Sequence, residues 1–598
     1  MTTSTGSRFL ALSWNPTTTS IDRLTNLDRL TASWWRRESA GAALFSQRED
    51  FAADDDAGQL CGATRLVLRP SAREAHDPAS LLRLLKMLPP DELRTLAPPF
   101  AVVRRTEQGL DAATDAFGVG QLFLCQAKGF AAVSNSASLM GRLFDCELDQ
   151  AALVGYAVLG AFQENDTPFR GVAKVPAGHA VQLRGAEASL RPYFDTANFG
   201  YAPEPGAGSL AEITRQVMDE LSEAVPQAEL ELSGGVDSRM MLAGLSPSRR
   251  RNHRALTIGP PDSPDVLIAS QLAARCGLDH RVIPTQNLGD LGREELQALL
   301  AVATETYDNA ANPIDKAALV LVNQRFPSAA RFSGQNGEIL RGFYYPGQPL
   351  ARQPSEDLAQ GLLRWRLVSN ECVDPRLFAG GPYGELRARA ETRVVRQLAE
   401  ARGPWWAALD RYYLYERMQR WVGNSASNTL GDRTVLYPFF DPRFVGAALA
   451  APGSVKLNSR AAFQLLANLD ADLAAQRLDS GLQPLAMSRS LALSRLEEGR
   501  YFLQKVAKRT KRVLSRGQHV TLGATSIVEL WGQHGLNETL PVAALQRTGL
   551  FDDAALESVA TGTWLPNRAT LGFLLMISGL VTSQETTGAK PVAAAAAL

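Results

Sequence analysis

Residues 231–239 read ELSGGVDSR, and the segments on either side show how this stretch is placed in the fold. Residues 228–232 alternate between polar and apolar side chains and predict a strand, whereas residues 240–245 are apolar and compatible with a helix. The stretch is therefore expected on a strand-to-helix turn. The adjacent glycines Gly234 and Gly235 allow the backbone to fold tightly around an anion without Cβ clashes.

The polar residues of this turn predict a phosphate site that also holds a metal. Ser233, Ser238 and the exposed N–H groups of the following helix would face the anion, assisted by the helix dipole. Asp237 would repel phosphate unless it held a cation, so we expect Mg²⁺ between Asp237 and a pyrophosphate group. The alternative is a plain glycine turn between a strand and a helix.

The pattern S-G-G-x-D-S resembles the pyrophosphate loop of the ATP pyrophosphatases. Members of that family split ATP between its α and β phosphates and adenylate an acid or carbonyl oxygen. The resemblance implies ATP and Mg²⁺ as cofactors. It also implies that Ser233, Gly234, Gly235, Asp237 and Ser238 bind the nucleotide.

The segments that follow alternate between strand and helix patterns. Arg254–Ile258 and residues 280–284 predict strands, and residues 264–277 between them predict a helix. Such alternation favours a parallel sheet with helices on both faces and ligands at the carboxyl ends of its strands. By resemblance, Leu232, Ile258 and Gly259 would line the adenine pocket. Asp265 begins a helix in a way that resembles the acidic helix start of the family, which would make it a site residue. The alternative is an ordinary carboxylate that the helix dipole favours at a helix start.

A second glycine-rich loop, residues 332–344, reads FSGQNGEILRGFY. It is similar to the S-G-x-G-G-D-E-L-F-G-G-Y loop of asparagine synthetase, and the matching residues are Ser333, Gly334, Gly337, Gly342 and Tyr344. The resemblance places Gly334 at the nucleotide and Glu338 where the family has a metal-binding aspartate. Asp237 and Glu338 would then share Mg²⁺, and with Tyr344 they form the predicted catalytic set.

This loop also departs from the family pattern. Ile339 stands where the family has a glutamate, and Arg341 replaces an aromatic residue, so we expect a remodelled acceptor side. A flexible glycine loop is the alternative interpretation of the whole stretch.

The N-terminal third predicts short strands separated by Gly, Asp and Asn. Its motif order, including DAFG at 115–118 and VPAGH at 175–179, is similar to the glutaminase domain of asparagine synthetase. That resemblance implies a four-layer αββα sandwich with an N-terminal nucleophile. The family's N-terminal cysteine is missing, since Cys61 is the first cysteine, and Thr2 lies about seven residues before the first strand. We therefore expect the domain to serve as a scaffold without glutaminase activity.

Segments further along the chain extend and limit the resemblance. Residues 410–421 predict a helix that carries Arg417 and Arg420. These arginines either contact phosphate or a substrate carboxylate, or they are only surface charges on the helix. Asp441 is expected to cap a further helix. Asp479 stands where the family has a transition-state lysine. The segment from Arg495 to Arg516 holds eight basic and two acidic residues, and is either a solvated helix or a docking surface for an acidic partner.

Bulk composition narrows the class of protein. The 598 residues are 45% hydrophobic and 21% charged with zero formal net charge, which is typical of a globular protein and gives no indication of nucleic-acid binding. We expect no signal peptide and no membrane span. Five scattered cysteines without metal-site spacing favour a reducing cytoplasm.

Taken together, the sequence predicts three domains and an amide-forming reaction. The domains are a glutaminase-like α+β sandwich at 1–205, an α/β ATP pyrophosphatase domain at 206–485 and a helical extension at 486–598. The enzyme would adenylate a carboxylate for attack by an amine. By resemblance, macrolactam formation by a lasso peptide cyclase is the preferred reaction; the implied partners are a small-molecule or peptide substrate, a leader-peptide-binding protein and a protease. A β-lactam synthetase, another specialised-metabolite amide synthetase and an inactive nucleotide-binding scaffold are the alternatives.

Overall fold

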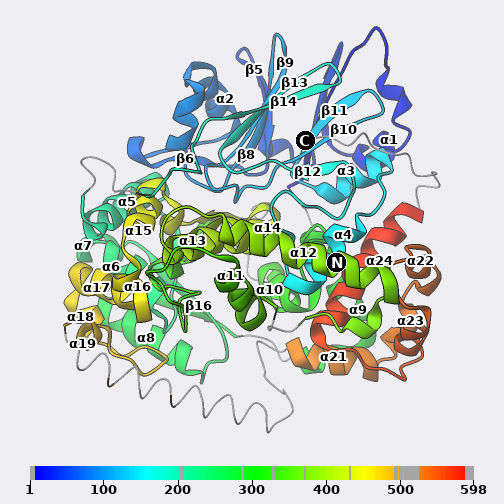
Figure 1. The fold of residues 1–598 in the computed structure, drawn as a ribbon. Helices are drawn as coiled ribbons and strands as arrows, with labels where there is room; N and C mark the ends of the chain where they lie inside the picture. Colours follow the sequence, from blue (N-terminus) through cyan, green and yellow to red (C-terminus); the bar gives the residue numbers. More distant parts are fainter. Residues whose placement is uncertain are drawn as a thin grey trace.

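The computed structural model describes most of the chain and shows several sheets surrounded by helices (Figure 1). The described residues are 7–201, 208–284, 288–325, 330–368, 372–429, 433–489, 496, 503 and 524–585. Thr2 and nearly all of the basic segment from Arg495 to Arg516 lie outside them, so the predictions made for these residues stay predictions.

The N-terminal region contains two antiparallel six-stranded sheets. The first has the order β12-β10-β11-β1-β3-β2, and the second has the order β14-β13-β9-β8-β5-β4. The strands of the first sheet are β12 Val172–Lys174, β10 Phe123–Ala127, β11 Phe130–Ser134, β1 Phe9–Trp14, β3 Ala42–Ser46 and β2 Trp35–Ser39. Those of the second are β14 Glu187–Pro192, β13 His179–Arg184, β9 Gly109–Thr114, β8 Ala101–Thr106, β5 Gly58–Gly62 and β4 Ala52–Asp55.

Successive side chains along each strand point to opposite faces of the sheet, and this determines what packs on each face. Phe9 and Ala11 of β1 point into the apolar core between the two sheets, whereas Leu10 and Leu12 point into the core on the opposite side. There they meet helices α3 Ala137–Phe144 and α4 Gln150–Leu159, and α2 Pro78–Met87 packs on the outer face of the second sheet. The layers therefore run helix, sheet, sheet, helix.

A third sheet, of five strands, is parallel throughout, as the alternating pattern predicts. Its order is β17-β16-β15-β18-β19, with bounds β17 Asp279–Ile283, β16 Arg254–Ile258, β15 Glu229–Glu231, β18 Ala330–Phe332 and β19 Thr434–Leu436. Ala255 of β16 packs into a core with α5 Leu210–Ala224, α6 Val236–Gly244 and α8 Pro264–Cys276. Leu256 packs on the other face against Val322 of α10 Pro313–Arg325, so helices cover both faces.

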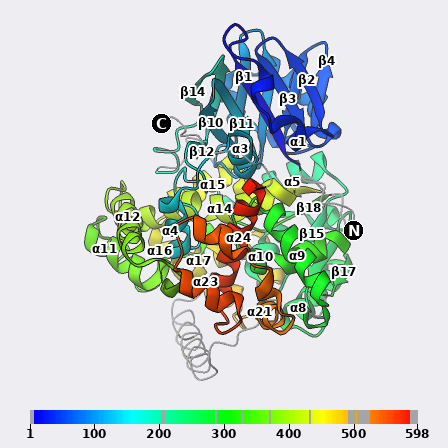
Figure 2. The ribbon, with the colours of Figure 1, turned by 90° about the vertical axis from the view of Figure 1, so that its right-hand side faces the viewer.

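The C-terminal helices pack against both earlier regions, as Figure 2 shows around α24. The helices are α21 Ala524–Gln533, α22 Val542–Arg547, α23 Asp553–Ala560 and α24 Arg568–Glu585. Their apolar residues share one core with α4, α9 Arg293–Thr306 and α10, and the ring of Phe573 stacks 6.0 Å from that of Tyr156 on α4. Helices make up most of residues 524–585, and the predicted domain boundaries stay predictions. Among the described residues, no helix combines the length and apolar character needed to cross a membrane.

Candidate functional site

The two predicted loops emerge side by side from the parallel sheet. The chain forms β15, β16 and β17 in one direction across the sheet, then returns to place β18 on the other side of β15. Residues 232–235 follow β15, and residues 333–337 follow β18. The carboxyl ends of these two strands form the switch point of the sheet, which is where open α/β sheets bind their ligands.

The first loop carries two serine hydroxyl groups and leads into the N–H groups at the start of α6. Ser233 Oγ lies 2.8 Å from Ser238 Oγ, and Ser238 Oγ accepts a hydrogen bond from the Ser233 amide over 3.0 Å. The Gly234 amide donates to Asp265 Oδ1 over 2.7 Å, so it is not available to an anion. No side chain of the described residues caps α6, and the amides of Val236 and Asp237 belong to its first turn, whose N–H groups have no acceptor within the helix. An anion would therefore meet the two hydroxyls and the start of α6.

The second loop packs directly on the first turn of α6. A Cβ atom built on Gly334 would lie 3.0 Å from the Ser238 amide nitrogen, and one on Gly337 would lie 2.8 Å from Asp237 Oδ1. Asn336 takes a left-handed conformation with φ 73°, and its Nδ2 donates to the Phe439 carbonyl over 2.7 Å. Glycine is required at these contacts because any side chain would separate the two loops.

Gly337→Ala is expected to lower activity about a hundredfold while leaving the fold intact, because it displaces Asp237 from its position against the loop. The measurement is ATP–pyrophosphate exchange, accompanied by a thermal unfolding curve. Gly361→Ala is the matched control, since a Cβ there meets nothing within 4 Å. Unchanged exchange in the Gly337 variant would contradict the importance of this contact.

Asp237, Glu338 and Arg341 form a charged cluster between the loops. Arg341 Nη1 donates to Asp237 Oδ2 over 2.9 Å and lies 3.9 Å from Glu338 Oε1. The pKa of Asp237 is raised to about 6, chiefly by burial. The nearby Glu338 adds to this increase in pKa, and Arg341 opposes it. Burial alone would lower the pKa of Arg341, but the two carboxylates raise it above its usual value. The structure thus brings together the two carboxylates that the sequence predicts as metal ligands.

The donor atoms of this cluster are compatible with a magnesium ion bound together with phosphate. Among the described residues, the buried Oδ1 of Asp237 has no hydrogen-bond partner, while Oδ2 accepts a hydrogen bond from Arg341. Within the described residues, no group of three or more His, Cys, Asp or Glu side chains could hold a metal. Two carboxylates suit Mg²⁺, which keeps several waters and takes its remaining ligands from substrate phosphates.

Glu338 connects this cluster to a group of aromatic residues. Its Oε2 accepts a hydrogen bond of 2.9 Å from the Tyr413 hydroxyl. The Tyr413 ring lies 5.3 Å from that of Phe343 and 6.5 Å from that of Tyr344. Tyr344 is buried, and burial raises the pKa of its phenol while nearby Arg417 lowers it. Tyr413, which the sequence analysis did not single out, is thus the tyrosine in contact with Glu338.

Asp265 and Asp479 both contact the first loop. Asp265 accepts from the Gly234 amide, whereas α8 is capped by Ser263, so Asp265 contributes more than a helix-start charge. The Asp479 amide donates to the Gly234 carbonyl over 3.2 Å. The buried Arg239 donates to the carbonyls of Gly234, Gln476 and Arg477 and thereby fixes this turn to the loop. A carboxylate therefore lies beside the loop at the position where the family pattern has a lysine.

The residues predicted to line an adenine pocket lie at the ends of the strands. Leu232 is buried in the core, and its carbonyl accepts from Thr257 Oγ1 over 2.7 Å. The Gly259 amide donates to the Ile283 carbonyl, and Ile258 packs against Leu256 and Ile283. Their assignment to adenine stays a prediction.

The two arginines predicted on one helix have different environments. Arg420 is buried and donates to the backbone carbonyls of Glu164 and Asp166, so its guanidinium joins the N-terminal region rather than facing a ligand. Arg417 is partly exposed and lies over the rings of Phe343 and Trp421. Asp441 caps α15 Pro442–Ala450 by accepting from the Arg443 amide over 2.9 Å, as predicted.

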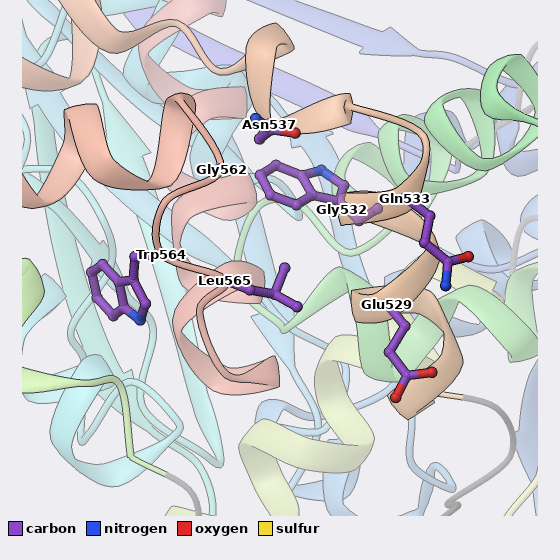
Figure 3. A pocket seen from close by; sticks show the side chains of 8 residues that line it. Glu529, Gly532, Gln533, Asn537, Gly562, Trp564 and Leu565 are labelled. Atoms are coloured by element: carbon purple, nitrogen blue, oxygen red, sulfur yellow. The ribbon is translucent and has the colours of Figure 1, made fainter.

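A separate hollow of about 320 Å³ lies between the C-terminal helices, and Figure 3 shows Glu529, Trp564 and Leu565 around it. None of its lining residues comes from the two loops at the switch point. This hollow is therefore not part of the candidate nucleotide site.

A comparison with known proteins finds a family similarity for the segment that contains the two loops. No curated protein matches this chain. Among solved structures, glutamine phosphoribosylpyrophosphate (PRPP) amidotransferase from B. subtilis is similar to this chain at 11% identity, and the alignment covers 66% of this chain and 88% of that chain with a TM-score of 0.20. Residues 211–468, which contain both loops and all five parallel strands, match the family model described as asparagine synthase. This segment is therefore similar to asparagine synthase.

Proposed function

We propose that this protein is an ATP-dependent ligase that activates a carboxylate as an acyl-adenylate and forms an amide. The observation that carries the proposal is the contact between the two loops at the switch point. Through that contact Asp237 lies beside Glu338 at the start of α6, and one of its oxygens has no hydrogen-bond partner in the described part of the chain. The match of residues 211–468 to the asparagine synthase model supports the same reaction class.

In the proposed reaction, the substrate carboxylate attacks the α-phosphorus of ATP and pyrophosphate leaves. An amine then attacks the acyl-adenylate, giving the amide, AMP and a proton. Ser233, Ser238 and the amides of α6 would bind the phosphates, and Leu232, Ile258, Gly259 and Gly334 would surround the rest of the nucleotide. The chain thus contributes positioning and charge neutralisation.

Two carboxylates and one arginine would control charge at the phosphates. Asp237 and Glu338 would hold Mg²⁺, which neutralises the negative charge that develops on pyrophosphate. Arg341 is the cation already placed between them, and it would compensate for Asp479 at the lysine position. Tyr413 would hold Glu338 in place through its hydroxyl, and Tyr344 stays in the proposed catalytic set.

The preferred substrate is a peptide whose Asp or Glu side chain is joined to its own N-terminal amine, as in lasso peptide macrolactams. The N-terminal sandwich would then act as a scaffold without glutaminase activity, because the chain has no cysteine before Cys61. The amine must in that case come from the substrate or a second molecule. Formation of a β-lactam or another amide is the second candidate, and the arginine that replaces an aromatic residue at position 341 is compatible with either.

ATP–pyrophosphate exchange tests the proposal directly. The full chain is incubated with Mg²⁺, ATP and labelled pyrophosphate, without glutamine, across a panel of carboxylates that includes Asp- and Glu-containing peptides. Exchange with one class of acid is expected, and it identifies the activated substrate. ATP binding without exchange for any acid would instead favour the inactive scaffold.

A further inference from the structure

Both carboxylate oxygens of Asp237 are covered by neighbouring residues. Oδ1 is buried and packs against Gly337, where a Cβ atom would lie only 2.8 Å from it. Oδ2 accepts the 2.9 Å hydrogen bond from Arg341 Nη1. Mg²⁺ binds together with several waters and needs an accessible carboxylate oxygen. A metal ion at Asp237 therefore requires that Arg341 first leave Oδ2.

The local backbone holds Arg341 next to the second carboxylate. Glu338 lies in the 3₁₀ helix η6 Gly337–Leu340, and Arg341 follows this helix directly. Side chains three residues apart in a 3₁₀ helix project from the same side, and Arg341 Nη1 lies 3.9 Å from Glu338 Oε1. The intervening Ile339 and Leu340 are buried in the apolar core and anchor the turn. The guanidinium group thus lies between the two carboxylates, where a shared metal ion would bind.

Arg341 is partly exposed, unlike the second arginine that contacts the first loop. The exposed fractions of the Arg341 and Glu338 side chains are 37% and 36%, so the guanidinium group borders solvent on one side. Arg239 is fully buried, and its guanidinium donates to three backbone carbonyls that hold it in place. Of these two arginines, Arg341 is therefore the one whose N–H groups are able to turn towards a bound phosphate.

The charges at the two loops give Arg341 two favourable positions. Without a metal ion, Asp237 and Glu338 repel each other, and the guanidinium group between them compensates for their charge. A divalent cation would compensate for the same charges and repel the guanidinium group, whereas nucleotide phosphates attract it and match its planar fork. Resting on the proposed ligase function, we infer that Arg341 closes the metal site in the nucleotide-free protein, leaves Asp237 when Mg·ATP binds, and then binds the phosphates as a catalytic cation.

Metal binding to the nucleotide-free chain tests this inference without turnover. Mn²⁺ is the probe, because it prefers the same oxygen ligands as Mg²⁺ and its unbound form is measured by electron paramagnetic resonance. Arg341→Gln is expected to bind Mn²⁺ about tenfold more tightly than the wild type, since the competing charge is removed. The double variant Arg341→Gln/Asp237→Asn should lose this gain. Arg254→Gln, which removes an exposed arginine paired with the exposed Asp279, is the matched control. A permanent structural pair predicts equal or weaker Mn²⁺ binding by Arg341→Gln, and that result overturns the inference.

Kinetics of ATP–pyrophosphate exchange test the second position of Arg341. With the acid that the wild-type chain activates, Arg341→Gln is expected to lower kcat about a hundredfold, because the charge that develops on pyrophosphate loses a cation. The Mg²⁺ concentration that gives half the maximal rate should fall in the same variant, and Arg341→Lys should restore part of kcat. A wild-type kcat in Arg341→Gln overturns the catalytic part of the inference. Absent exchange in the wild type counts against the ligase proposal, whereas the Mn²⁺ measurement still decides whether Arg341 closes the metal site.

Discussion

Asp237→Asn is expected to lower ATP–pyrophosphate exchange about a thousandfold, because a metal-held phosphate contributes several kcal/mol to the transition state. The asparagine keeps the size of the side chain but loses the charge that would hold Mg²⁺ and pair with Arg341. The side chain lies in the first turn of α6, where an uncharged amide alone does not disturb the helix. The measurement is exchange at saturating Mg²⁺ and ATP with the preferred acid.

Two controls define what this result means. Asp279→Asn replaces an exposed aspartate that pairs with the exposed Arg254, and it should retain wild-type exchange. Glu338→Gln should resemble Asp237→Asn if the two carboxylates share the metal. Wild-type AMP formation by the Asp237 variant would remove Asp237 from the proposed metal site.

Lys456→Met is expected to lower the free energy of unfolding by about 3–5 kcal/mol, since it leaves a buried carboxylate without its partner. Lys456 is fully buried, and its Nζ donates to Asp410 Oδ2 and to the Ala448 carbonyl. Asp410 also accepts a hydrogen bond of 2.8 Å from the Tyr345 hydroxyl. The ion pair thus anchors the residue that follows Tyr344 in the candidate site.

Urea denaturation, monitored by tryptophan fluorescence, measures this loss of stability. Trp406 is a local reporter, because the centroid of its ring lies 4.9 Å from Lys456 Nζ. The double variant Lys456→Met/Asp410→Asn removes both charges and keeps an acceptor for Tyr345, so it should recover a large part of the lost stability. Equal stability of the single variant and the wild type would show that the pair contributes nothing.

The sequence predicted the local elements well where side-chain periodicity and turn chemistry determine them. β16 begins and ends at the residues predicted for it, Arg254–Ile258. The strand, glycine turn and helix around Asp237 follow from apolar alternation and the paired glycines. These features depend on neighbours within a few residues, and a single sequence contains that information.

Contacts between distant segments could not be read from the sequence. The hydrogen bond from Gly234 to Asp265 spans 31 residues, the one from Tyr413 to Glu338 spans 75, and the carbonyl contacts of Arg420 span more than 250. The sequence analysis grouped Arg417 and Arg420 as equivalent, yet a π-helical segment directs one towards Phe343 while the other is buried against Glu164 and Asp166.

The sequence by itself determined that a turn with two glycines, two serines and an aspartate follows a strand and opens a helix, because the residues concerned are adjacent in the chain. Only the tertiary structure decided which side chains surround that turn. The order of the parallel strands places β18 beside β15, and this brings Glu338 and Arg341 to Asp237 across about a hundred residues. The packing of the sheet and its helices selects that order through burial of apolar side chains along the whole chain, which no local pattern encodes.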